Sequence, residues 1–250
     1  MTQNTKKTTF FQEVRSFIGV IILACLIRTL VFEPFYIPSS SMEPTLLEGD
    51  YIFSTKYDYG YSKYSLSPFV FDIFEGRVLA QQPKRGDIMI FRPPHQMDVR
   101  YIKRLVGLPG DTVQFIDGQL YINNELVERK YVGQYTDVKG QEFKKYEEIL
   151  PGGISHDIIT VDEGQKTDLF KVPEGHYFFL GDNRDFSADS RYQLGYVPSQ
   201  NIISKAKIIH FSTQHPLWVS DQSILDRFKQ VGLWISSIRW GRMFHSLYSN

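Results

Sequence analysis

The sequence has little cysteine and no excess charge of either sign. Cys25 is the only cysteine among 250 residues, so no disulfide can form within the chain, and this leaves the redox compartment open. Lys+Arg and Asp+Glu total 28 each, which disfavours nucleic acid or a strongly acidic molecule as a partner. No periodic repeat appears, and no long amphipathic helical pattern interrupts the middle of the chain.

Aromatic and turn-forming residues are abundant. The chain has 15 Tyr and 19 Phe, residue types that suit strands and membrane interfaces, with 12 Pro and 18 Gly scattered among them. The alternating segment that follows Asp117-Gly118 predicts a β-hairpin. This composition predicts a turn-rich, mostly β protein.

One apolar run is long enough to suggest a membrane anchor. Residues 17–32 read FIGVIILACLIRTLVF, and their flanks extend the expected span to residues 17–35. Lys6, Lys7 and Arg15 precede the run, so the positive-inside rule places the N-terminus in the cytoplasm and the rest of the chain outside.

A cleavable signal peptide and a buried core helix are the alternatives for this run. Ser39 and Ser41 form a small-x-small pair, but they lie well past the apolar residues, beyond the bulky sequence EPFYIP and just before Pro44. We therefore favour an uncleaved anchor over a signal peptide. A core helix of a soluble domain is the least favoured of the three.

The serines of IPSSSMEPTLLEGD raise the question of a nucleophile, which needs a neighbouring base. No histidine lies in a context typical of a catalytic triad, and no His/Cys spacing suits zinc. We therefore expect surface or structural roles for His95, His156, His176, His210, His215 and His245.

Lysine is the other candidate base, provided that its charged form is disfavoured. A lysine pKa near 10.4 must fall by about three units, equivalent to roughly 4 kcal/mol, which burial can supply. In RYIKRLVGLPG, a strand period of two places Lys103 on one face with Tyr101 and Leu105. An exposed strand lysine remains the ordinary interpretation of this pattern alone.

Four segments in the same order carry a family resemblance. FEPFYIPSSSMEPTLLEGD, KRGDIMIF, YIKRLVGLPGD and GDNRDFSADSR follow the apolar run, and together they resemble the conserved boxes of bacterial signal peptidase I. The resemblance implies a single transmembrane helix and a β-rich catalytic domain of antiparallel sheets, with a short α-helical C-terminal tail. It also implies removal of signal peptides by a Ser/Lys dyad.

The resemblance also implies residue roles. Ser41 is the expected nucleophile, Lys103 the general base and Ser39 an oxyanion donor. The residues expected to support them are Ser187, Asp189, Arg191, Arg104 and Asp182.

The same family cleaves after small-x-small residues, which shallow apolar pockets select by excluding larger side chains. An extended substrate would pair with the strand near Ser41. The pocket walls implied by the resemblance are Phe35, Ile37, Pro38, Met42, Leu46, Ile52, Ile90, Tyr101 and Ile102. Ordinary β-core packing explains these apolar residues equally well.

The spacing of Asp182, Asp185 and Asp189 does not match a calcium-binding loop, because Arg184 and Phe186 fall where ligands should be. We expect no metal, no cofactor and no nucleic-acid partner. The expected partners are the signal peptides of exported preproteins and the lipid bilayer, with a monomeric enzyme in the bacterial cell membrane.

The chain divides into five expected parts. These are a cytoplasmic N-terminus at 1–16, the anchor at 17–35, a β-rich catalytic core at 36–128 and 166–215, an insertion with weak order signals at 129–165, and a helical tail at 216–250. The aromatic-rich residues 57–74 are a candidate contact with the membrane interface. Two rival functions are a peptidase specialised for one precursor and a non-catalytic anchored assembly module.

Overall fold

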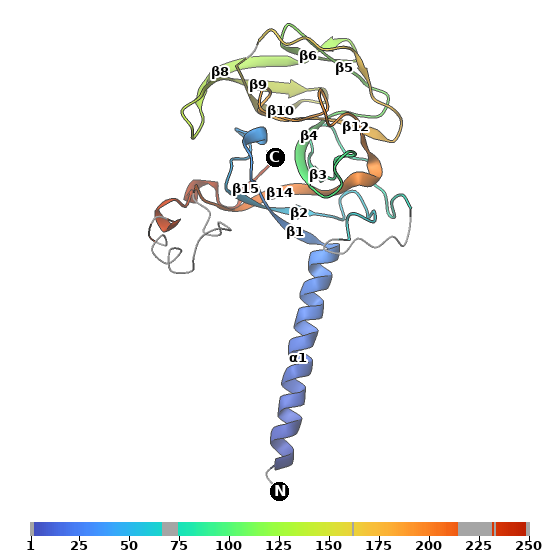
Figure 1. Cartoon of the computed structure of the whole chain (residues 1–250), viewed down its shortest axis with the longest axis vertical. Helices are drawn as coiled ribbons and strands as arrows, with labels where there is room; N and C mark the ends of the chain where they lie inside the picture. Colours follow the sequence, from blue (N-terminus) through green and yellow to red (C-terminus); the bar gives the residue numbers. More distant parts are fainter. Residues whose placement is uncertain (1–2, 67–74, 162, 215–231, 233, 249–250) are drawn as a thin grey trace.

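We describe the fold from a computed structural model of the 250-residue chain (Figure 1). The description covers residues 3–66, 75–161, 163–214, 232 and 234–248. Most of the candidate interface segment at 57–74 is within this range, but its last eight residues, 67–74, lie outside it.

A single long helix projects from one end of a β-rich body (Figure 1). Helix α1 spans Gln3–Leu30, and its 21-residue segment Phe10–Leu30 contains an 18-residue stretch with a mean hydropathy of 1.9, none of it buried. At 1.5 Å per residue this segment is about 30 Å long, which matches the hydrocarbon thickness of a bilayer. The helix is therefore long and apolar enough to cross a membrane.

The helix bounds differ from the expected span of 17–35. The helix begins earlier and ends at Leu30, and residues 31–35 lead into strand β1 (Phe32–Tyr36), which pairs with β2 (Asp50–Thr55). Pro34 explains the early end, because proline disfavours helical conformation in the preceding residue and removes a backbone donor.

The main sheet has eight strands in the order β1-β2-β14-β3-β4-β12-β13, and β15 pairs with β14. Its remaining members are β3 (Ile88–Phe91), β4 (Tyr101–Gly107), β12 (His176–Leu180), β13 (Val197–Pro198), β14 (Ile202–Ser212) and β15 (His245–Ser246). All of the strand pairings in this sheet are antiparallel, as the fold class predicted.

A four-stranded sheet in the order β11-β5-β6-β7 lies farther from the helix (Figure 1). Its strands are β11 (Phe170–Lys171), β5 (Thr112–Ile116), β6 (Gln119–Ile122) and β7 (Glu125–Leu126). The predicted hairpin at Asp117-Gly118 is confirmed: it joins β5 to β6, and both turn residues have positive φ, 50° and 74°. Glycine suits such a turn because it has no Cβ.

Residues 129–165, for which the composition indicated weak order, contain most of a three-stranded sheet. Strands β8 (Glu128–Thr136), β9 (Glu142–Leu150) and β10 (Ile154–Thr160) pair in the order β10-β9-β8. Cross-strand aromatic contacts such as Tyr131 with Tyr146, with ring centroids 5.5 Å apart, stabilise the pairing.

The tail expected to be helical over 216–250 is only partly described, because residues 215–231 lie outside the description. Residues 232 and 234–236 are helical, as the tail was expected to be, whereas its described end contains the short 3₁₀ helix η3 (Trp240–Arg242) and strand β15. The backbone N–H of Leu247 donates to the Lys207 carbonyl at 3.0 Å, which fastens the end to the main sheet.

Candidate active site

Ser41 lies in a loop that is fastened at both ends. The loop joins β1 to β2 and contains the 3₁₀ helix η1 (Ser40–Met42). At its base the N–H of Ile37 donates to the Asp50 carbonyl at 2.9 Å, and the N–H of Gly49 donates to the Ile37 carbonyl at 3.0 Å. Met42 is fully buried beside the serine, so its side chain anchors the loop in the core.

Lys103 reaches Ser41 from the middle of the main sheet. It lies in β4, between β3 and β12, and its Nζ donates to Ser41 Oγ at 2.6 Å and to the Ile102 carbonyl at 3.1 Å. Tyr101 and Leu105 belong to one core cluster, which confirms that they share a strand face. Lys103 itself is only 5 % exposed.

Burial changes the chemistry of this amine. It lowers the pKa of Lys103 to about 8, although the negative charges of Asp189 and Asp182 act in the opposite direction. About a tenth of Lys103 is therefore neutral at pH 7, and a neutral amine can accept a proton from the Ser41 hydroxyl.

Asp189 and Arg191 form a buried ion pair close to the dyad. Arg191 Nη2 lies 2.8 Å from Asp189 Oδ2, and both side chains are 0 % exposed. The N–H of Gly181 donates to the same carboxylate oxygen at 3.0 Å. The pair therefore fixes the backbone at the end of β12, where the chain approaches Ser41.

Gly181 and Ser187 form the tightest part of this approach. A Cβ on Gly181 would lie 2.3 Å from Ser187 Oγ and 2.5 Å from the Ser41 carbonyl oxygen, so only glycine fits. Ser187 Oγ is buried and makes no hydrogen bond within the described part of the chain. The structure thus places Ser187 beside Ser41, and its expected contact with the lysine amine stays a prediction.

Arg104 and Asp182 form a second buried pair. Arg104 Nε donates to Asp182 Oδ1 at 2.8 Å, and Arg104 Nη2 donates to Oδ2 at 2.7 Å. Thr45 Oγ1 also donates to Asp182 Oδ2 at 2.6 Å. Asp182 therefore connects β4 with the loop that carries Ser41.

Ser39 is exposed, unlike the other predicted catalytic and supporting residues, which are buried. It precedes η1 in an extended conformation, with φ −144° and ψ 156°, and its side chain makes no capping hydrogen bond. Its hydroxyl therefore has no role in holding η1, and its expected oxyanion role stays a prediction.

The predicted pocket residues divide into two groups. Those that belong to a buried core cluster, at most 2 % exposed, are Ile37, Met42, Leu46, Ile52 and Ile90. Those that keep exposed surface are Phe35, Pro38, Tyr101 and Ile102. The second group has surface open to solvent, and two of its members, Phe35 and Ile102, pack against the cluster that contains the first group.

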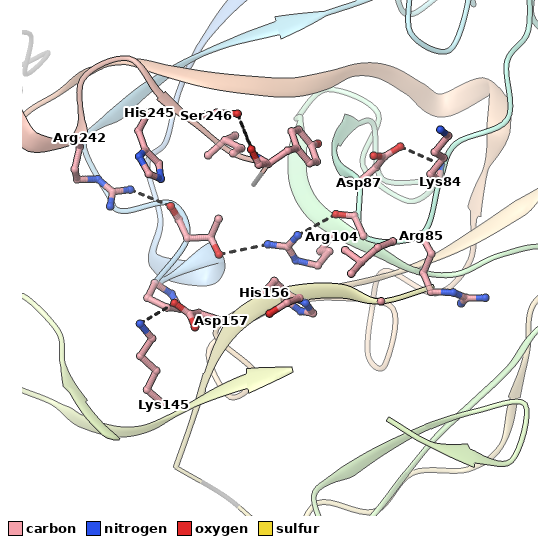
Figure 2. Close-up of a pocket in the computed structure, with 18 residues that line it drawn as sticks. Lys84, Arg85, Asp87, Arg104, Lys145, His156, Asp157, Arg242, His245 and Ser246 are labelled. Carbon is pink, nitrogen blue, oxygen red and sulfur yellow. Dashed lines mark hydrogen bonds and ion pairs between the residues drawn. The ribbon is translucent and has the colours of Figure 1, made fainter. Parts of the chain in front are cut away.

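A cleft of about 770 Å³ lies beside the site, between the main and three-stranded sheets (Figure 2). Its lining includes Thr45, Arg104 and His156, and neither Ser41 nor Lys103 lines it. Figure 2 shows Arg104 and His156 near the middle of the cleft. The cleft is therefore separate from the place where Lys103 meets Ser41.

Sequence reasoning missed a residue that contacts the nucleophile's backbone. Asn183 donates its N–H to the Ser41 carbonyl at 3.2 Å and its Nδ2 to the Ser40 carbonyl at 3.3 Å. Asn183 stands between Asp182 and Arg184 in the fourth motif. An amide side chain inside that motif is the sequence feature that could have identified it.

A serine whose hydroxyl meets a buried amine has the arrangement expected of a serine hydrolase with a lysine base. The sequence matches the family model described as signal peptidase, peptidase S26, over residues 10–211, and the chain belongs to this family. The resemblance seen in the four sequence motifs is therefore confirmed, and the chain is a peptidase of the signal peptidase class.

Relatives that match nearly the whole chain carry the name of the same family. Signal peptidase I of Rickettsia canadensis (strain McKiel) is 50% identical over 256 residues, covering 98% of this chain and 96% of the relative. Signal peptidase I of Rickettsia massiliae (strain Mtu5) is 50% identical over 261 residues, covering 99% and 98%. A crystal structure of a signal peptidase I from Enterococcus faecalis V583 is 32% identical, with a TM-score of 0.33, and covers 50% of this chain and 97% of that one.

Proposed function

We propose that Ser41 and Lys103 form the catalytic dyad with which this family member removes signal peptides from preproteins. The observation that carries the proposal is the 2.6 Å contact between Lys103 Nζ and Ser41 Oγ in buried surroundings. The lowered pKa of Lys103 supports its role as the base. Together they give the serine an acceptor for its proton.

In the proposed reaction the neutral Lys103 amine takes the Ser41 proton while Oγ attacks the scissile carbonyl carbon. The Ser41 backbone N–H and the Ser39 hydroxyl donate to the oxyanion that forms, which is typically worth a few kcal/mol. The lysine ammonium then protonates the leaving amine, and the C–N bond breaks to leave an acyl-enzyme. Water, deprotonated by Lys103, hydrolyses the ester and releases Ser41.

Substrate binding rests on the accessible apolar residues beside the dyad. Phe35 lies in β1, and Tyr101 and Ile102 lie at the start of β4, so an extended peptide between these strands contacts all three. Shallow contact surfaces of this kind accept Ala or Ser and exclude larger side chains by steric clash. Cleavage after small-x-small residues follows from this arrangement.

The anchor keeps the reaction close to the membrane. Helix α1 ends at Leu30, and the eleven residues from there to Ser41 span at most about 36 Å when extended. With Lys6, Lys7 and Arg15 on the cytoplasmic side, Ser41 works on the exported side, where a preprotein emerges.

The decisive experiment is cleavage of a purified preprotein by the full chain in detergent. Ser41→Ala and Lys103→Ala should each abolish measurable cleavage, and Ser40→Ala should retain it because Ser40 has no assigned chemistry. Retained cleavage by Ser41→Ala would refute the mechanism. Loss of cleavage only in Ser40→Ala would show that Ser40, and not Ser41, is the nucleophile.

A further inference from the structure

The three-stranded sheet contributes two buried polar side chains to the edge of the active site. Glu148 lies on β9 and His156 lies directly opposite it on β10, so their side chains share one face. Glu148 is 1 % exposed and His156 is 8 % exposed. Burying such groups is costly unless they have partners, so their contacts indicate what they do.

Glu148 holds Arg184. One carboxylate oxygen accepts from Arg184 Nη1 at 2.8 Å, and the other accepts from Arg184 Nη2. Burial works to raise the pKa of Glu148, but Arg184 and His156 outweigh it and keep the pKa well below the ordinary value. Glu148 is therefore ionised, and the two-point contact fixes the direction of the guanidinium.

His156 lies between two carboxylates. Its Nε2 is 3.4 Å from Glu148 Oε1 and 4.0 Å from Asp182 Oδ1. Burial, together with the charge of Arg104, lowers the pKa of His156, so the ring is neutral and carries one N–H. Neither ring nitrogen makes a hydrogen bond within the described residues, so the ring lies between the Glu148–Arg184 pair and the Asp182–Arg104 pair and meets both by proximity.

Both pairs meet at residues 182–184, which strand β10 also holds through its backbone. The N–H of Ile159 donates to the Asp182 carbonyl at 2.9 Å, and the N–H of Arg184 donates to the Ile159 carbonyl at 2.9 Å. Ile159 and Asn183 form a parallel bridge. Residues 182–184 thus behave as an added strand at the side of β10.

The same short segment contacts the nucleophile loop. Asn183 donates to the carbonyls of Ser41 and Ser40, and Asp182 accepts from Thr45. A shift of this segment relative to β10 therefore moves the Ser41 backbone relative to Lys103, whose strand β4 is held in place by its pairing with β3 and β12.

We propose that Glu148 and His156 are positioning residues for Ser41, acting through Asp182, Asn183 and Arg184. The proposal rests on the proposed function, because it assigns them to the alignment of the serine with its base. The three-stranded sheet then has a part in catalysis although it supplies no residue of the dyad. A misplacement of reacting groups by about 1 Å can reduce a rate by roughly 100-fold, so small shifts here are measurable.

The test measures kcat and KM for preprotein cleavage by the full chain in detergent. Glu148→Gln keeps the side-chain shape but removes the charge that holds Arg184, so kcat should fall roughly 10- to 100-fold with KM changed less than about twofold. Glu147→Gln is the matched control. Glu147 is the adjacent residue on β9 and contacts Ser155, and this substitution should leave both constants unchanged.

A pair of His156 variants separates positioning from simple stability, and decides the question if Glu148→Gln fails to fold. Gln can place an amide N–H near the position of Nε2, so His156→Gln should retain most of kcat, whereas His156→Leu should lose roughly 10-fold or more. Thermal unfolding identifies the folded variants. Equal kcat for folded His156→Leu and wild type, or for folded Glu148→Gln and wild type, would overturn the proposal.

The Ser41→Ala variant, assayed alongside, distinguishes the two levels of failure. If it cleaves, the proposed dyad is wrong whatever the other variants do. If it is inactive while Glu148→Gln and His156→Leu keep the kcat of wild type, the dyad stands and only the positioning role fails.

Discussion

Two lysines are buried in the part of the chain that the structure describes, and their amines contact different groups. Lys56 follows β2 and is 0 % exposed, and its Nζ lies 2.9 Å from Glu33 Oε2. Glu33 also pairs with Arg100 at 2.7 Å. Lys103 is 5 % exposed and contacts the Ser41 hydroxyl and a backbone carbonyl. Within the described residues, no carboxylate lies within ion-pair distance of Lys103.

The contrast shows how the contact partner, and not burial alone, decides what a lysine can do. Burial lowers the pKa of both amines, but at Lys56 the adjoining Glu33 carboxylate opposes that effect directly. At Lys103 the opposing charges of Asp189 and Asp182 act without direct contact, and the pKa settles at about 8. Lys56 is suited to hold β1 against β2 as an ion pair, and Lys103 is suited to exchange a proton.

The largest effect expected from this comparison is on catalysis by Lys103. Lys103→Arg keeps the positive charge but cannot release a proton near neutral pH, so cleavage should fall at least about 1,000-fold, equivalent to about 4 kcal/mol. Lys103→Met, which has similar length and no charge, should lose as much. Single-turnover cleavage of a preprotein measures both.

The two Lys103 variants distinguish a base from a structural cation. If Lys103→Arg kept a tenth or more of wild-type activity while Lys103→Met lost it, the amine would act through its charge. Lys103 would then resemble Lys56, which acts as a cation in an ion pair and not as a base.

The next effect removes the partner of Lys56. Glu33→Gln leaves Lys56 and Arg100 without their carboxylate, so the free energy of unfolding should fall by about 3 kcal/mol. Burial then lowers the pKa of Lys56 further below its unfolded value. Between these two pKa values the unfolded state holds a proton that the folded state lacks, so stability rises with pH. The deficit of the variant should therefore be larger at pH 6 than at pH 9.

Thermal or denaturant unfolding in detergent at both pH values measures this deficit. A Glu33→Gln variant as stable as wild type would show that Lys56 does not depend on its partner. A deficit that grew with pH would show that the pKa of Lys56 in the folded variant is not lowered below its unfolded value.

The third effect is the pH dependence of cleavage. Because the free Lys103 amine must be neutral to act as the base, kcat/KM should fall as pH falls below about 8, by about tenfold for each unit well below that value. A rate profile between pH 6 and 10 on one preprotein checks this. A profile that is flat between pH 6 and 8 would contradict the pKa assigned to Lys103.

The sequence alone pointed to Ser41 and Lys103 as the candidate dyad but could not distinguish this lysine from others by physical criteria. Strand alternation placed Lys103 on a face with Tyr101 and Leu105, yet that pattern does not show which residue faces the amine across the sheet. The order of the four family motifs provided the assignment. The contacts of Arg104 with Asp182 and of Asp189 with Arg191 agree with the grouping that the motifs implied.

Other features depended on pairings that no local pattern encodes. The helix ends at Leu30 because Pro34 disfavours its continuation and residues 32–36 pair with β2 instead. Mostly apolar residues suit an anchor and an edge strand equally. Glu148 and His156 lie outside the motifs. Glu148 meets Arg184, and His156 lies beside Asp182, only because β9 and β10 fold back beside residues 182–184. The polar composition of residues 129–165, interrupted by glycines, gave no indication of this sheet.

The smallest effect tests the structural side of the comparison. Lys56→Arg preserves a positive charge, and a guanidinium can pair with Glu33 as the ammonium does. The cost comes from fitting a larger group into a fully buried position, which is typically 1–3 kcal/mol of stability for overpacking. In the folded variant kcat and the pH profile should match those of wild type, because Lys56 takes no part in proton transfer. Arg thus replaces one buried lysine with activity intact and abolishes activity at the other. A large loss of kcat in folded Lys56→Arg would show that this ion pair also controls the dyad.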